Sequence, residues 1–219
     1  MEAWWPERAG GAANAPGGSV AEAFGMVTPA DGKAGLRSLL FLATDPDDAA
    51  APAVREAALD LGLRAAAPVL LLDLATPGNA QHRFFAEADR LVPRQAAMQA
   101  GPPGFAALHF QRVQDTRLYV TRVEPDPAVF ATSTWREAGS TGLPRLLRLF
   151  GAMIIAAPDL RNSPGGLGLA AGADGVVLVL RRGRTFVEAA ASLNQQVQRA
   201  GGRPVGVVMT DCPPDRRFG

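Results

Sequence analysis

The residues best placed for chemistry are three aspartates, Asp45, Asp47 and Asp48, in a segment that links an apolar stretch to a predicted helix. In α/β proteins such a segment binds phosphate groups, because unpaired backbone amides and the positive end of the helix converge there. Phosphate-binding loops of this kind are rich in glycine and contain a lysine followed by serine or threonine. This segment has neither glycine nor lysine. The sequence therefore predicts the scaffold of a nucleotide site without its phosphate-binding chemistry.

The aspartates have two interpretations that do not conflict. Asp47 or Asp48 fits a plain N-cap of the following helix, and Pro52 fits its first turn. A carboxylate about 6 Å from a phosphate charge costs about 3 kcal/mol per unit pair at an effective dielectric of about 20. Asp45, Asp47 and Asp48 would therefore repel a polyanion, because the usual cation of such a loop is missing.

Composition excludes several other classes of function. The 22 basic and 21 acidic residues nearly cancel, which gives no electrostatic case for nucleic acid. Cys212 is the only cysteine, so an internal disulfide and a cysteine-based metal cluster are excluded, and His82 and His109 are too few and too isolated to suggest a metal site. No apolar run approaches the ~20 residues of a membrane helix, and the N-terminus lacks a signal-peptide core. We expect a cytoplasmic protein.

Alternating apolar segments and helical patterns predict a single α/β domain, with three layers and a mostly parallel sheet flanked by helices. A capping box of Thr185 and Glu188 predicts the start of the last helix, and Gly201 and Gly202 predict its end. Pro93 is expected to interrupt a helical region at 79–100. The expected strands are 36–43, 69–74, 105–113, 118–123, 152–156, 175–180 and 205–210, and the other expected helices are 20–26, 53–63 and 144–150.

The ends of the chain are expected to be tails. Residues 1–19 form a predicted flexible tail, 20–215 the domain and 216–219 a short second tail. Trp4 and Trp5 in the first tail are either an anchor for a partner or incidental aromatic residues.

Several short motifs of the sequence resemble those of the bacterial tyrosine-autokinase (BY-kinase) domains of exopolysaccharide and capsule biosynthesis. These domains are a branch of the ParA/MinD-type P-loop ATPases. The resemblance covers roughly residues 20 to 215 and is most specific in its last third. It implies a P-loop NTPase-like, SIMIBI-type fold. The matching phrases are Glu22–Gly25, Val69–Ala75 for the extended Walker A′ strand, Met153–Asp159 for Walker B, Ala173–Val179 with Arg182–Thr185, and Gly206–Thr210.

The sequence differs from the family at the residues that bind phosphate and magnesium and carry out phosphoryl transfer. The phosphate-binding lysine corresponds to Ala50 or Ala51, and the magnesium-binding Ser/Thr to Pro52. Asp73 is the only survivor of the family's acidic set. The degenerate nucleotide site implied by the resemblance comprises Asp47, Asp48, Ala50, Ala51, Pro52, Asp73, Ala75 (second acid of the A′ strand), Ala156 (Walker B aspartate) and Asp159.

The family's other functional residues are also missing. Its C-terminal tyrosine cluster has no equivalent in 213–219, and the only tyrosine, Tyr119, lies in a predicted strand. Gly25 and Thr28 replace the arginines with which the family forms rings. Glu22 and Phe24, with Trp4 and Trp5, are therefore candidate partner-docking residues.

The resemblance with these departures implies a pseudo-ATPase that needs no cofactor and acts through a membrane polysaccharide co-polymerase, another assembly protein or a paralogue. Three alternatives remain. One is an active, atypical ATPase or tyrosine autokinase that holds Mg-ATP with Asp73 and residues 45–48. The second is a ParA/MinD-like regulator, disfavoured because the tail at 212–219 is too short for an amphipathic membrane helix. The third is an unrelated α/β enzyme, for which no nucleophile–base pair is evident.

Overall fold

The computed structural model describes residues 20–26, 35–45, 50–75, 78–98, 107–124 and 131–211. These residues form one eight-stranded sheet in the order β3-β4-β5-β2-β6-β1-β7-β8. The pairs β3–β4 and β4–β5 are antiparallel, and every other neighbouring pair is parallel. The prediction of a mostly parallel α/β sheet is confirmed.

The strands are β1 (Ser38–Ala43), β2 (Val69–Asp73), β3 (Leu91–Met98), β4 (Ala107–Val113), β5 (Leu118–Glu124), β6 (Ala152–Ala156), β7 (Gly175–Arg181) and β8 (Pro204–Thr210). The helices are α1 (Val20–Ala23), α2 (Ala50–Arg64), α3 (Ala80–Glu87), α4 (Thr132–Glu137), α5 (Leu143–Leu146) and α6 (Val187–Arg199). A π-helix, Ala138–Gly142, joins α4 to α5, and a 3₁₀ helix, Pro164–Gly172, precedes β7.

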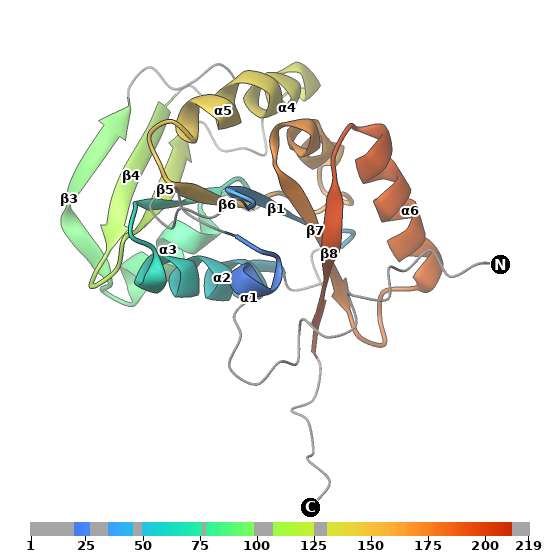
Figure 1. Cartoon of the computed structure of the whole chain (residues 1–219), viewed down its shortest axis with the longest axis horizontal. Helices are drawn as coiled ribbons and strands as arrows, with labels where there is room; N and C mark the ends of the chain where they lie inside the picture. The colour runs from blue at the N-terminus through green and yellow to red at the C-terminus, as the bar shows by residue number, and fades with distance from the viewer. Residues whose placement is uncertain are drawn as a thin grey trace, which may run out of the picture.

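Helices cover both faces of the sheet (Figure 1). α2 packs on one face through Val54, Ala57 and Leu61, together with α1 and α3. α6, α4, α5 and the 3₁₀ helix pack on the other face, where Trp135 and Leu193 are buried. The strands between these layers are apolar on both faces, since every residue of β1, β2 and β6 is buried.

The region 79–100 is only partly helical, which corrects the prediction. α3 ends at Glu87, and residues 91–98 form β3 instead of a second helix. β3 lies at the edge of the sheet, where a strand needs partners on one side only, and its pairing with β4 shifts register between Leu91 and Gln95. Pro93 falls within this irregular stretch, so its missing N–H costs little there.

The segment before β6 contains more helix than the predicted 144–150. α4, the π-helix and α5 follow one another without a break from Thr132 to Leu146. Gly139 and Gly142 lie inside the π-helix. Gly139 is required there by close packing, since a Cβ at this position would lie 2.2 Å from the carbonyl oxygen of Gly168.

The predicted capping box of α6 is wrong. The N-cap residue is Phe186, which forms no side-chain cap, and the Thr185 hydroxyl accepts a hydrogen bond from the backbone N–H of Arg181 at 2.8 Å. Leu193 and Val197 of α6 are buried, but Phe186 is 76% exposed. Helix α6 therefore starts at Val187, two residues after Thr185.

Arg37 joins the end of α5 to the start of β6. Its Nε donates to the carbonyl oxygen of Gly151 at 3.0 Å, and its Nη2 donates to those of Leu147 at 2.6 Å and Phe150 at 3.2 Å. One planar guanidinium thus satisfies three carbonyl groups that follow a helix end.

Replacing Arg37 with alanine is expected to lower the free energy of unfolding by about 2 kcal/mol, because charge-assisted hydrogen bonds contribute most when their partners are partly buried. Urea unfolding measures the change. Arg37→Lys should recover less than half of the loss, since an ammonium group cannot reproduce the fork. Arg148→Gln, at an exposed arginine of the same region, is the matched control. If Arg37→Lys were as stable as the wild type, the planar guanidinium would not have the role assigned to it here.

Within the described residues, no helix combines the length and the apolar character that a membrane crossing requires.

Candidate functional site

The sequence-predicted site lies at the carboxyl ends of three central strands. Ala156 at the end of β6 pairs with Asp73 of β2 on one side and with Phe41 of β1 on the other. Ala50, Ala51 and Pro52 form the first turn of α2, and Ala75 lies two residues beyond β2. The structure therefore brings these positions together at the carboxyl ends of the central strands. Asp47 and Asp48 lie outside the described residues.

Asp73 is fully buried at the centre of this site. Its Oδ2 accepts a hydrogen bond from the backbone N–H of Gln81 at 2.7 Å, and its own N–H donates to Thr121 Oγ1 at 2.9 Å. Its Oδ1 is buried and has no hydrogen-bond partner among the described residues. Burial raises the pKa of Asp73 to about 6, against the opposing effect of backbone N–H groups at Gln81, Ala75 and His82.

This carboxylate caps α3 from outside the helix. The N-cap residue Asn79 has a left-handed backbone (φ 62°) and forms no side-chain cap. Its amide instead pairs with the backbone of Val123, donating from Nδ2 at 3.2 Å and accepting at Oδ1 at 2.7 Å. The first turn of α3 therefore directs its free N–H groups at Asp73.

Two residues that the sequence did not single out fill the space between Asp73 and α2. Gln81 is fully buried and donates from Nε2 to the carbonyl oxygen of Ala51 at 3.1 Å. Its Oε1 accepts from Arg55 Nε at 3.0 Å, and the Arg55 guanidinium stacks on Phe84 with Cζ 3.4 Å from the ring centroid. Burial lowers the pKa of Arg55, and the charge of Asp73 opposes this. A polar residue in an amphipathic helix gives no sequence signal for such a role.

The segment after β6 crosses the end of β1. The backbone N–H groups of Leu160 and Arg161 donate to the carbonyl oxygens of Ala43 at 3.0 Å and Thr44 at 3.2 Å. Arg161 Nη1 also pairs with Asp45 Oδ2 at 2.6 Å. Asp45 therefore has a cationic partner from outside the loop, which the sequence analysis did not predict.

Asp159, the other predicted acid of the site, is engaged locally. Its Oδ1 accepts from the backbone N–H of Asn162 and its Oδ2 from Asn162 Nδ2, both at 2.9 Å. These bonds fold the turn that presents Arg161 to Asp45.

The candidate docking residues are only partly described. Trp4 and Trp5 lie outside the described residues, and Glu22 falls within α1. Phe24 is half-buried and packs inside the molecule: a Cβ at Gly206 of β8 would lie 2.2 Å from its ring. The absence of a side chain at Gly206 is what admits the ring.

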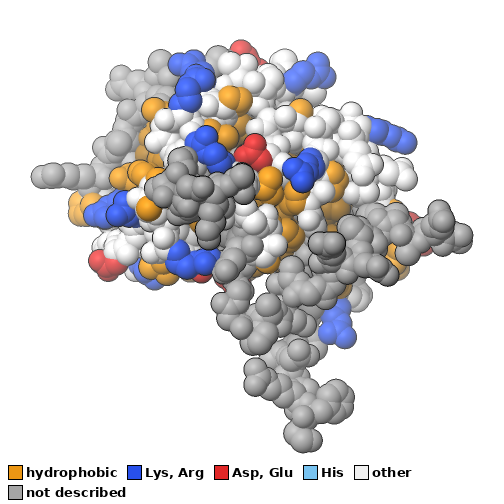
Figure 2. All heavy atoms as spheres, in the orientation of Figure 1, with side chains coloured by type: hydrophobic (Ala, Val, Ile, Leu, Met, Phe, Trp, Pro, Cys, Tyr) orange, Lys and Arg blue, Asp and Glu red, His pale blue; other side chains and the backbone are white. Residues whose placement is uncertain are grey.

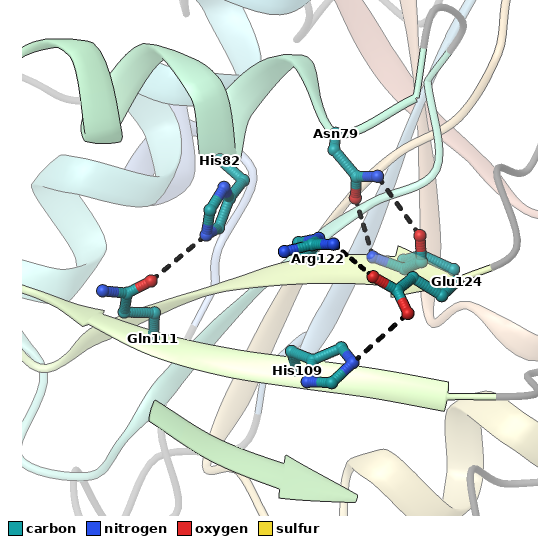
Figure 3. A network of polar contacts seen from close by, with 7 residues as sticks. Asn79, His82, His109, Gln111, Arg122 and Glu124 are labelled. Carbon is teal, nitrogen blue, oxygen red and sulfur yellow. Dashed lines mark hydrogen bonds and ion pairs between the residues drawn. The ribbon is translucent and has the colours of Figure 1, made fainter. Parts of the chain in front are cut away.

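His82 and His109, which the sequence suggested were isolated, belong to one polar network beside α3, β4 and β5 (Figure 3). His82 Nε2 lies 3.2 Å from Gln111 Oε1, and His109 Nε2 lies 3.7 Å from Glu124. Burial lowers the pKa of His82, with smaller effects from Arg122 and His109. Among the described residues, no group of three or more His, Cys, Asp or Glu side chains could hold a metal ion.

Solved structures decide the fold family of this arrangement. The chimerical protein CapA2B2 matches with a TM-score of 0.60 and 14% identity, over 85% of this chain and 80% of that chain. The kinase domain of the Escherichia coli tyrosine kinase ETK matches with a TM-score of 0.56 and 14% identity, over 84% and 72%. The chain has the fold of these two proteins.

The same fold occurs in a further solved structure. A plasmid partition protein from Borrelia burgdorferi matches with a TM-score of 0.55 and 10% identity, over 83% of this chain and 84% of that chain. No protein-family profile matches the sequence, and a search of curated proteins finds no match. At these identities the comparisons establish the fold and leave function to the site.

Proposed function

We propose that this chain is a non-catalytic, BY-kinase-like protein that acts by protein–protein interaction in bacterial exopolysaccharide or capsule biosynthesis or export. Its partner would be a membrane polysaccharide co-polymerase or another assembly protein, alone or with a paralogue in an oligomer. The protein would be cytoplasmic and held at the inner membrane by that partner. The observation that carries the proposal is the state of Asp73, the one acid retained from the family's set.

Phosphoryl transfer requires cations for the phosphates and accessible acids for magnesium and the nucleophile. Asp73 Oδ2 is occupied by the N–H of Gln81, and Oδ1 has an accessible area below 1 Å². Neither oxygen is open to a metal ion in this arrangement. Gln81 and Arg55 occupy the space beside the first turn of α2, where Ala50, Ala51 and Pro52 offer no side-chain group for phosphate or magnesium.

A second candidate, an atypical ATPase or autokinase, rests on the buried Oδ1 of Asp73, which lacks a partner. A rearrangement of Gln81 would expose this oxygen to Mg²⁺. That candidate predicts ATP hydrolysis that disappears in both Asp73→Asn and Asp48→Asn. A ParA/MinD-like regulator would share the fold and differ in its partner.

Mg-ATP is expected to bind the purified protein with a Kd weaker than about 1 mM, and to leave the unfolding temperature unchanged at ligand concentrations below that value. Isothermal titration calorimetry and thermal unfolding measure the two quantities. Micromolar affinity for Mg-ATP, with turnover lost in Asp73→Asn, would replace the proposal by its alternative.

The partner is tested separately, by co-purifying the protein with the polysaccharide co-polymerase encoded in the same genome. We expect a stable complex whose amount does not change with Mg-ATP. If no such complex forms, and the protein also binds no nucleotide, the pathway assignment fails while the non-catalytic site remains.

A further inference from the structure

A preformed groove lies on the α6 side of the sheet, on the opposite face from Asp73 and α2. Its volume is about 410 Å³, within the range of pockets that bind small ligands or side chains. One wall consists of Thr132, Arg136 and Ser140, and the facing wall includes Leu167, Ala171 and Ala200. The first wall is polar and basic, and the second is apolar.

Backbone packing holds the two walls at a fixed separation. A Cβ at Gly139 of the π-helix would lie 2.2 Å from the carbonyl oxygen of Gly168, and one at Gly172 would lie 1.8 Å from that of Gly139. A π-helix is rare and occurs frequently at functional sites. This one extends α4 so that Ser140 follows Thr132 and Arg136 along the same wall.

The basic wall lacks a counter-charge. Among the described residues, the Arg136 guanidinium has no hydrogen-bond or ion-pair partner. Arg136 is the one charged residue among the described residues that line the groove. On the face shown in Figure 2, the described basic side chains are widely spread and the acidic ones are few. The groove therefore fits an occupant that combines carboxylates with large apolar side chains.

We propose that residues 2–7 of this same chain, Glu-Ala-Trp-Trp-Pro-Glu, dock in this groove. The segment contains two of the three tryptophans of the protein, flanked by Glu2 and Glu7. A tryptophan ring supplies the apolar surface for the wall of Leu167 and Ala171, and a neighbouring carboxylate pairs with Arg136.

The residues between this segment and α1 are long enough for the segment to reach the groove. The described residues begin at Val20 in α1. Phe24, directly after this helix, packs against β8 and shares a second cavity with Arg203 and Pro204. Ala200, in the wall of the groove, lies only a short turn before Arg203. Residues 8–19 can span about 40 Å when extended, which is enough to pass this turn. The proposal is independent of the proposed function, because it involves neither nucleotide nor partner.

The test is ¹⁹F NMR of the full chain labelled with 5-fluorotryptophan, with Trp4→Phe and Trp5→Phe assigning the signals. A labelled peptide of residues 1–8 gives the reference for the undocked state. We expect at least one of the two N-terminal signals to differ from the peptide. Arg136→Gln, and independently Ala171→Glu at the exposed facing wall, should remove most of that difference. Raising the salt from about 0.05 M to about 0.5 M should reduce it in the wild type.

Arg148→Gln is the matched control, since it removes one exposed arginine outside the groove and should leave the signals unchanged. Thermal unfolding verifies that each variant is folded. Wild-type signals that coincide with the free peptide, or that do not respond to either groove variant, would overturn the proposal. Signals that change on dilution would also overturn it, because the groove would then bind a second copy of the chain.

Discussion

Asp73→Asn is expected to stabilise the protein by about 3 kcal/mol at neutral pH. The carboxyl group has a pKa of about 6 in the folded state and 3.8 in its ordinary state, and each unit of difference corresponds to about 1.4 kcal/mol. Asparagine is neutral at every pH, and its carbonyl oxygen can still accept the hydrogen bond from the N–H of Gln81.

The sign of the pH dependence follows from the raised pKa. Below the unfolded-state pKa, Asp73 is protonated in both states and its contribution to stability is fully present. As the pH rises through about 6, the folded protein must lose this proton from a buried site, and the contribution is lost. The advantage of Asp73→Asn should therefore be near zero at about pH 4 and grow to its full value by about pH 7.

Urea unfolding of both proteins across this pH range measures the difference directly, which cancels the titration of every other group. Asp60→Asn is the control, because Asp60 forms only a surface ion pair with Arg64, four residues along α2. Its effect should stay within about 0.5 kcal/mol. A loss of stability in Asp73→Asn at neutral pH would show that the ionised carboxylate has a favourable partner in solution, such as a metal ion.

Gly172→Ala is expected to destabilise the protein by about 3 kcal/mol, the largest loss that a single methyl group should produce here. The added Cβ would lie 1.8 Å from the carbonyl oxygen of Gly139, a backbone atom that cannot move aside without shifting the π-helix. This contact joins the π-helix to the 3₁₀ helix. The variant should therefore also disturb the walls of the groove.

Urea unfolding measures the loss, and the ring environment of Trp135 reports on the groove by near-ultraviolet circular dichroism. Ala171→Ser changes an exposed neighbour by one atom and should alter stability by less than about 0.5 kcal/mol. An unfolding free energy equal to that of the wild type in Gly172→Ala would mean that the two helices are packed less tightly than the structure indicates.

The result for Asp73→Asn also bears on why an aspartate occupies this position, if the proposed loss of catalysis is right. A buried carboxylate with one unpaired oxygen destabilises the fold at neutral pH, and an asparagine would be the simpler cap for α3. If Asp73→Asn is more stable and retains its partner, the aspartate is a remnant of the ancestral site. If the variant no longer binds the proposed partner, Asp73 contributes to binding by fixing the position of α3 on the surface that the partner contacts.

The sequence alone determined the architecture and the positions of the central strands. The runs 39–43, 69–72, 152–156 and 175–180 are continuous apolar segments, which are typical of strands in a mostly parallel sheet covered on both faces. The absence of lysine and glycine from residues 44–55 was also evident from the sequence, because it depends only on which residues occupy these positions.

Tertiary structure alone decided what the remaining polar residues do. Asp73 meets Thr121 across 48 positions of sequence, and Arg161 meets Asp45 across 116. The order of strands in the sheet brings these pairs together, and local patterns do not encode that order. For the same reason, residues 91–98 form an edge strand that tolerates Pro93, although their local pattern favoured a helix.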